Sequence, residues 1–322
     1  SGLPRLPGNF APKDPRNPYA DYTEGLLHAF LSGCTLERVP GERYEYSNLG
    51  MGLLGQVLAR KANASFEALL QERIFRPLGM DSTCLALTPP LRSRLAPPHN
   101  ADLEPDHLWD FQALAGAGAI RSTASDLARF LRACVGLEET PLKGAIAASL
   151  VPRRDIGDGG RMGLGWHIRP DGQVAWHNGG TGGYHAMLMA VPAKKRGVVV
   201  LCNAATSTVD ALGAKLLEVL DGADPPPVSV RVPAPVDRTV LAKMAGRYEL
   251  FPGFVLTVTL QDGRLMAQAT GQPAFRIYPE SETHFFYRVV EAQIEFVKNG
   301  KGEVESLVLH QGGRRMPGRR VP

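Results

Sequence analysis

The sequence lacks several features that would assign it to a common class of protein. No apolar run approaches the roughly 18 residues that a membrane-spanning helix requires. The first residues show no charged segment followed by an apolar one, so they do not read as a secretory signal. The net charge is only +4, and nucleic acid is therefore not expected as a partner. The basic pairs near the C-terminus are interpreted as a solvated tail: Arg314-Arg315 and Arg319-Arg320.

Cysteine and metal-ligand patterns are equally sparse. The four cysteines lie far apart in the chain and form neither a zinc knuckle nor a redox pair: Cys34, Cys84, Cys134 and Cys202. The histidines other than His177 show no metal-ligand spacing, so neither a metal nor a cofactor is expected. No Gly-x-Ser-x-Gly sequence occurs, which argues against an α/β-hydrolase.

Length and composition indicate a globular protein with two domains. Hydrophobic residues make up 44% of the 322 residues and charged residues 21%, which is enough apolar material for a sizeable core. Residues 221–238 contain five prolines and no helical pattern, and are predicted to be a stiff linker. The linker divides the chain into a first domain, 1–220, and a C-terminal module, 239–322.

Hydrophobic periodicity predicts an α+β first domain. Amphipathic spacing favours helices at residues 21–31, 51–61, 65–75, 124–135 and 209–220. Alternation favours antiparallel strands at residues 162–168, 173–177, 186–191 and 198–201. Short alternating strands and Gly-containing turns in the C-terminal module predict a small barrel or sandwich. We therefore expect an antiparallel sheet flanked by helices, plus a small all-β barrel-like C-terminal domain.

A polar strand that ends in glycines is the first candidate for a functional site. Residues 176–184 read Trp-His-Asn-Gly-Gly-Thr-Gly-Gly-Tyr. Glycine lets a ligand approach the main chain closely, and a free backbone N–H at such a place can donate to a developing oxyanion. The pattern suits acyl-transfer chemistry, although a plain glycine-rich hairpin has the same appearance. The proline-punctuated stretch 87–114 is long enough to be a functional loop or a cap over the cleft.

A second polar segment, Tyr46-Ser47-Asn48, opens the helix that ends near Lys61. A tyrosine can serve as a general base where nearby cations lower its pKa. An asparagine amide offers both a donor and an acceptor to a substrate that contains an amide. Taken alone, the tripeptide also fits a helix start with an aromatic packing residue.

Five segments in a fixed order resemble a known family. They are Tyr46-Ser47-Asn48, Pro77-Leu78-Gly79-Met80, Ser122-Thr123 with Asp126, Gly163-Leu164-Gly165-Trp166, and His177-Asn178-Gly179-Gly180. The set resembles the serine hydrolases of the class C β-lactamase, penicillin-binding-protein and esterase family. The C-terminal module is similar to the small β domain often appended to such enzymes.

The resemblance implies roles for individual residues. Tyr46 matches the family's general base, His177 its Lys/His position, and the backbone N–H of Gly180 an oxyanion donor. The positions implied as catalytic are therefore Tyr46, His177 and Gly180. The positions implied as substrate-binding are Asn48, Asn178 and Gly179. No metal is implied.

One element of the family pattern is missing from these residues. The family's nucleophile lies upstream, in a Ser-x-x-Lys motif at the start of a helix, and this chain contains no Ser-x-x-Lys. The nearest string, Thr140-Pro141-Leu142-Lys143, follows Tyr46 and is in the wrong order. Ser1-Gly2-Leu3-Pro4 resembles the end of an internal family loop. We expect a β-lactamase/transpeptidase-like domain without its N-terminal part, inactive by itself, with the missing N-terminal segment as a partner.

The resemblance implies hydrolysis of an ester, a D-amino-acid peptide or a β-lactam through an acyl-enzyme. His177 in place of lysine favours an esterase or peptidase over a dedicated β-lactamase, because a neutral imidazole binds a carboxylate weakly. The expected partner is a small-molecule or peptide substrate, and the expected location is periplasmic or secreted. A catalytically inactive binding protein that keeps the cleft is the alternative. Ser1 as an N-terminal nucleophile, with its own amine as base, is disfavoured by the family likeness of residues 1–4.

Overall fold

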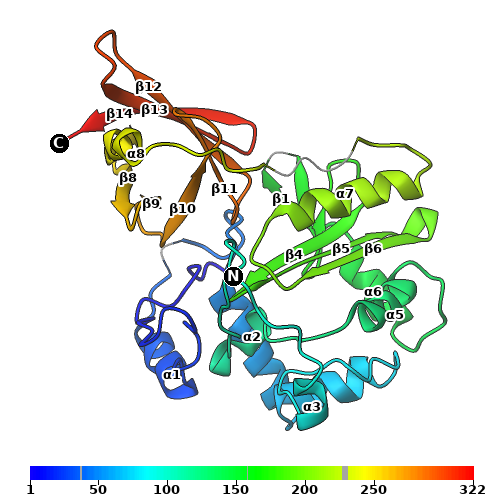
Figure 1. The fold of residues 1–322 in the computed structure, drawn as a ribbon. Helices are drawn as coiled ribbons and strands as arrows, with labels where there is room; N and C mark the ends of the chain where they lie inside the picture. The colour runs from blue at the N-terminus through cyan, green and yellow to red at the C-terminus, as the bar shows by residue number, and fades with distance from the viewer. Residues whose placement is uncertain (37, 158, 227–230) are drawn as a thin grey trace. The chain divides into compact units, whose positions relative to one another are not determined.

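The structure is a computed structural model that describes residues 1–36, 38–157, 159–226 and 231–322 (Figure 1). Residues 227–230 of the predicted linker lie outside the described residues. The chain separates into two compact units. The first comprises Ser1–Ala205 with Val209–Pro225, and the second comprises Thr206–Thr208 with Pro226–Pro322. Each unit has a hydrophobic core of its own.

The first unit is built on a six-stranded antiparallel sheet whose strands follow chain order. They are β1 (Arg154–Gly157), β2 (Gly160–Met162), β3 (His167–Ile168), β4 (Ala175–Thr181), β5 (Tyr184–Val191) and β6 (Arg196–Cys202). Successive side chains of a strand point to opposite faces. In β5, Met187 and Met189 therefore pack beneath α7 (Thr208–Leu220), while Leu188 and Ala190 join the cluster that contains α5 (Ala124–Cys134). Figure 1 shows α7 and α5 on opposite faces of the sheet.

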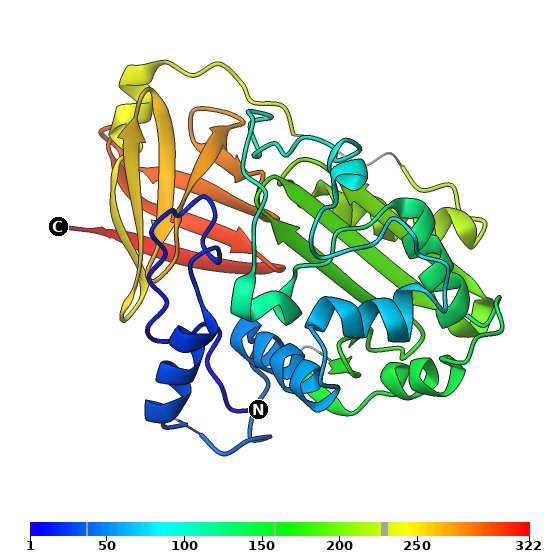
Figure 2. The same cartoon turned by 90° about the horizontal axis from the view of Figure 1, so that it is seen from below.

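The other helices of this unit precede the sheet or join its strands. They are α1 (Glu24–Gly33), α2 (Asn48–Lys61), α3 (Phe66–Leu70), the π-helix η1 (Gln71–Phe75), α4 (Pro89–Arg92), the 3-10 helix η2 (Gln112–Ala117), α6 (Lys143–Leu150) and the 3-10 helix η3 (Pro192–Lys194). Helix α2 lies directly beside η2 (Figure 2). Helix α2 starts where it does because the Ser47 hydroxyl accepts a hydrogen bond from Gly50 N–H at 2.8 Å.

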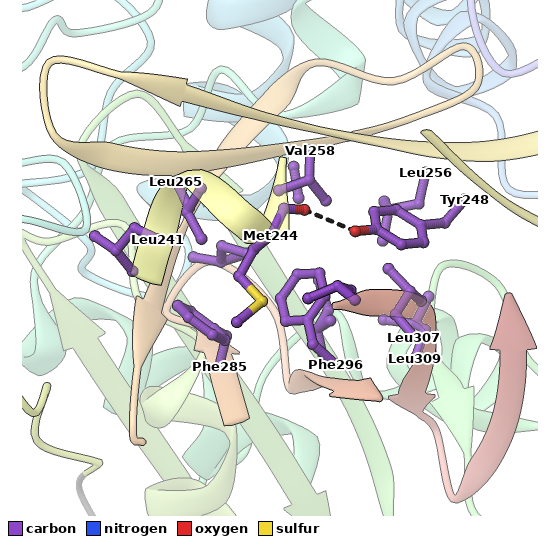
Figure 3. Close-up of a cluster of buried hydrophobic side chains, with 14 of the residues drawn as sticks. Leu241, Met244, Tyr248, Leu256, Val258, Leu265, Phe285, Phe296, Leu307 and Leu309 are labelled. Carbon is purple, nitrogen blue, oxygen red and sulfur yellow. Dashed lines mark hydrogen bonds between the residues drawn. The ribbon is translucent and has the colours of Figure 1, made fainter. Parts of the chain in front are cut away.

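The second unit is a closed antiparallel barrel of eight strands in the order β10-β11-β12-β13-β14-β7-β8-β9. Its elements are α8 (Arg238–Met244), β7 (Gly246–Phe251), β8 (Phe254–Gln261), β9 (Arg264–Ala269), β10 (Ala274–Pro279), β11 (His284–Tyr287), β12 (Ala292–Lys298), β13 (Val304–Gln311) and β14 (Arg314–Val321). Apolar side chains fill its interior (Figure 3). The buried Tyr248 hydroxyl donates to Met244 O at 2.8 Å. The interior is a packed core.

The predicted fold class is confirmed: a sheet flanked by helices and a C-terminal β-barrel. The predicted tail is wrong, because its arginines lie in β14, which closes the barrel between β13 and β7, although their side chains are exposed as expected. Only Met316 and Gly318 of this strand turn inward. Most of the remaining residues are arginines, so the sequence shows little of the hydrophobic alternation that would have predicted a strand. The predicted strand 162–168 is broken at Gly163-Leu164-Gly165, since Gly165 has φ +81°. Helix α6 and strand β1 were not predicted.

Candidate active site

The site starts from strand β4, one side of which is mostly unpaired. Strand β3 pairs with β4 only at Ala175 and Trp176, whereas β5 pairs along the whole of β4. From His177 onward the β3 side of β4 therefore has no strand partner in the described part of the chain. Gly179 and Gly180 are exposed along this edge.

The register of the β4–β5 hairpin sets the direction of the Gly180 N–H. The turn has two residues, so the flanking pair Thr181–Tyr184 forms the hydrogen-bonded pair next to the turn. The next pair, Gly180–His185, is then of the non-hydrogen-bonded kind, and its N–H groups point away from the partner strand. The Gly180 N–H is directed at the open edge, where an oxyanion donor is required.

The turn itself is covered by the long loop that follows α4. A Cβ atom at Gly182 would lie 2.2 Å from the carbonyl oxygen of His107, and one at Gly183 would lie 2.4 Å from Cβ of Pro98. Gly183 also has φ +69°, which other residues rarely adopt. The His99 N–H donates to Gly183 O at 3.2 Å. The two glycines are needed because the loop packs against bare backbone.

The structure brings Tyr46 and His177 together. Their ring centroids are 6.5 Å apart, although the two residues belong to different elements. His177 lies on the α5 face of β4, the same face as Ala175 two positions earlier. Its Nδ1–H donates to the backbone oxygen of Asn178, which leaves Nε2 as the ring's acceptor. Tyr46 is 38% exposed, so a reactant can reach its hydroxyl from solvent.

A cation lies beside Tyr46 that the sequence did not indicate. The Arg5 guanidinium is 5.4 Å from the centroid of the Tyr46 ring, within the range of a cation–π interaction. The first residues are tied to the start of α2, because the Ser47 hydroxyl donates to Pro4 O at 2.6 Å and Leu49 N–H donates to Arg5 O at 3.2 Å. Arg5 therefore belongs to the site through this short segment.

Asn48 is held by a tyrosine that sequence reasoning also missed. The Asn48 side-chain amide donates to the Tyr19 hydroxyl at 2.7 Å. Burial raises the pKa of Tyr19 above its ordinary value, so the hydroxyl remains protonated at neutral pH. Tyr19 packs against Phe10, Trp109 and Phe111. No local pattern in the proline-rich start of the chain marks Tyr19 as a neighbour of Asn48.

The structure places the other two predicted substrate-binding residues, Gly179 and Asn178, in different surroundings. Gly179 stays on the exposed edge, but the Asn178 side chain points to the opposite face, where it donates to Asp210 Oδ2 at 2.8 Å. This follows from alternation, because Asn178 is adjacent to His177 in an extended strand. The Asn178 backbone therefore lies at the open edge of β4, whereas its side chain lies on the face that α7 covers.

A second histidine, His167, lies next to the site. Its ring stacks on Trp176 at 4.6 Å and lies 5.4 Å from the His177 ring. Burial, together with the charge that His177 acquires on protonation, lowers the pKa of His167. His167 therefore stays neutral near pH 7 and presents no positive charge to His177.

A cavity of about 450 Å³ lies on the other face of the sheet, where Trp176, Met187, Met189 and Asp210 line it. His167, whose ring lies 5.4 Å from that of His177, also lines this cavity. Within the described residues, no group of three His, Cys, Asp or Glu side chains is arranged to hold a metal ion. None of the described helices has the length and apolar character needed to cross a membrane.

Known protein families match both parts of this chain. The family model described as Beta-lactamase matches residues 1–222, and the one described as Domain of unknown function (DUF3471) matches residues 230–320. The chain belongs to the β-lactamase family. It carries a DUF3471 domain at its C-terminal end.

The relatives include penicillin-binding proteins and peptidases. A penicillin-binding protein of Bacillus subtilis (strain 168) is 27% identical over 97% of this chain and 74% of its own length. The D-alanyl-D-alanine-carboxypeptidase/endopeptidase AmpH of Escherichia coli (strain K12) is 28% identical over 53% of this chain. This chain spans 48% of AmpH. A solved class C β-lactamase superposes with a TM-score of 0.59 at 25% identity, covering 70% of this chain and 68% of that one.

Proposed function

We propose that the chain is the substrate-binding and proton-transfer part of a serine hydrolase that works through an acyl-enzyme. The observation that carries this proposal is the convergence of Tyr46 and His177 beside the outward-facing N–H of Gly180. In this role Tyr46 accepts the proton of the attacking hydroxyl, and the Gly180 N–H donates to the oxyanion that forms on the substrate carbonyl. The Asn48 amide binds an amide of the substrate.

The substrate class follows from the site and from the relatives. An ester, a D-amino-acid peptide or a β-lactam each presents a carbonyl that becomes an oxyanion on attack. The names of the relatives, β-lactamase and D-alanyl-D-alanine-carboxypeptidase, support this range. A histidine in place of lysine at position 177 gives a carboxylate no permanent positive charge, which favours ester or peptide substrates over β-lactams. Residues 239–322 are proposed to form an accessory domain. The protein is proposed to be periplasmic or secreted.

The nucleophile is proposed to lie on a segment that is not among these 322 residues. Their complete sequence contains no Ser-x-x-Lys, whereas it contains the base, the amide and the oxyanion donor. The 322-residue chain incubated with a fluorescent penicillin or a fluorophosphonate should therefore keep its intact mass. A stoichiometric adduct on any serine, Ser1 included, would refute this assignment of the nucleophile.

The roles of Tyr46 and His177 are tested in an enzyme that carries this chain together with a Ser-x-x-Lys segment. Tyr46→Phe should lower kcat by about a hundredfold or more, because it removes the base. Tyr44→Phe is the matched control, since Tyr44 is equally exposed at 38%. His177→Lys should move one limb of the pH–rate profile to higher pH and favour substrates with a carboxylate. An unchanged rate and pH profile in His177→Ala would show that β4 is not part of the active site.

The absent Ser-x-x-Lys also favours a second candidate, a binding protein that keeps the cleft and performs no chemistry. The two differ in one measurement. The binding protein would retain a β-lactam or D-amino-acid peptide reversibly, even when a Ser-x-x-Lys segment is present. The hydrolase would then form a covalent adduct and release product.

A further inference from the structure

The first unit contains a histidine–carboxylate pair that the proposed chemistry does not use. Asp210 of α7 lies on the face of the sheet opposite to His177. Its Oδ1 accepts from the Nε2–H of His185 at 2.9 Å, and its Oδ2 accepts from the Asn178 amide at 2.8 Å. The His185 side chain is 11% exposed and the Asp210 side chain 30% exposed, so the carboxylate keeps partial contact with water. One carboxylate thus binds β4 and β5 together.

The two partners of Asp210 lie next to the part of β4 that borders its open edge. Asn178 directly follows His177, and its backbone oxygen accepts from the His177 Nδ1–H. His185 is the cross-strand partner of Gly180, and a Cβ atom built at Gly180 would lie 3.4 Å from His185 Nδ1. Movement of either partner would therefore displace a group that the proposed reaction needs.

The His177–Asn178 hydrogen bond also selects a tautomer. A carbonyl oxygen only accepts, so the bond requires a proton on Nδ1 of His177. In the neutral ring Nε2 then carries the lone pair, and Nε2 is the nitrogen left for Tyr46 or a substrate. The position of the Asn178 backbone oxygen decides whether this tautomer is favoured.

Close packing fixes Asp210 in space. Gly213 lies one turn further along α7, on the same side of the helix. A Cβ atom at Gly213 would lie 2.7 Å from Cγ of Met187 in β5, so the helix backbone rests directly on the sheet. Val209 and Leu217 of the same helix are also buried. The carboxylate is consequently a rigid anchor for both strands.

We infer that Asp210 is a positioning residue for the active site. From the far face of the sheet it holds Asn178 and His185, and through them it sets the tautomer of His177 and supports the backbone of β4 behind Gly180. This inference rests on the proposed function, in which His177 and Gly180 take part. It assigns no chemical step to Asp210.

The test uses the 322-residue chain with 15N-labelled histidine and requires no turnover. Long-range 1H–15N spectra report which ring nitrogen of each histidine carries the proton, and His177→Gln identifies the His177 signals. In the unmodified chain His177 should be the Nδ1–H tautomer at neutral pH. In Asp210→Ala it should shift to a mixture that contains the Nε2–H tautomer. Asp210→Asn should give a smaller shift, because its amide keeps one acceptor oxygen.

The matched control is Glu218→Ala, which removes an exposed carboxylate from the same helix and should leave the His177 signals unchanged. If Asp210→Ala does not fold, Asn178→Ala replaces it. That variant keeps the His185–Asp210 pair and removes only the donor from β4, and the same change of tautomer is expected.

The inference is overturned if His177 keeps its tautomer in the folded Asp210 variants or, where these do not fold, in Asn178→Ala. A response confined to His185 would likewise overturn it, because Asp210 would then support His185 alone. Either result would leave the proposed function standing, since that depends on the kinetics of Tyr46→Phe and His177→Ala. Conversely, the tautomer change would still be observed in a chain that catalyses nothing.

Discussion

Removal of the Asp126 carboxylate should destabilise the first unit by about 3–6 kcal/mol, the sum for two hydrogen bonds to a buried charged group. The Asp126 side chain is 3% exposed. It accepts from Ser82 N–H at 2.8 Å, from the Thr83 hydroxyl at 2.8 Å and from Arg129 Nη1 at 2.9 Å. Hydrogen bonds to a charged group contribute about 1.5–3 kcal/mol each. The figure counts the first two bonds, because the Arg129 side chain is 48% exposed and can be rehydrated.

The assay is urea unfolding of Asp126→Ala followed by tryptophan fluorescence. All three tryptophans, Trp109, Trp166 and Trp176, lie in the first unit, so the signal does not report on the barrel. Asp126→Asn keeps an acceptor oxygen and should lose less. The matched control is Asp81→Ala, an exposed carboxylate whose loss should cost less than about 0.5 kcal/mol. Equal unfolding midpoints for Asp126→Ala and Asp81→Ala would show that the buried network contributes nothing.

Two further predictions concern titratable groups. The pKa of His167 is lower in the folded protein than its value of about 6.5 in the unfolded chain. The unfolded chain therefore takes up this proton more readily, so the free energy of unfolding is highest above about pH 6.5 and falls as the pH drops through the folded pKa. The urea midpoint should thus fall more steeply from pH 7 to pH 5 in the unmodified protein than in His167→Gln, and parallel curves would contradict this. Burial raises the pKa of Cys134 to about 12, so a thiol reagent at pH 8 should label the half-buried Cys34 well before Cys134 in the native protein. Site-resolved mass spectrometry checks the order, and equally fast labelling would argue against a buried Cys134.

The sequence determined those features that depend on near neighbours along the chain. Helices α2 and α5 could be placed from their amphipathic spacing, and in the structure the Ser47 and Thr123 side chains cap their first turns. The antiparallel strands and the barrel followed from alternation, which is local as well. Tyr46 and His177 could be chosen in advance, because both belong to short ordered motifs.

Only the tertiary structure decided which distant groups meet these motifs. Arg5 lies over Tyr46 and Tyr19 binds Asn48 because separate segments pack together, and no periodicity along the chain encodes such contacts. Alternation fixed Asn178 and His177 on opposite faces of β4, but packing decided which of these faces α7 covers. With α7 packed on one face of the sheet, the Asn178 amide binds Asp210 there, while His177 on the other face lies near Tyr46. The sequence supplies the side chains of the site, and packing decides which of them meet.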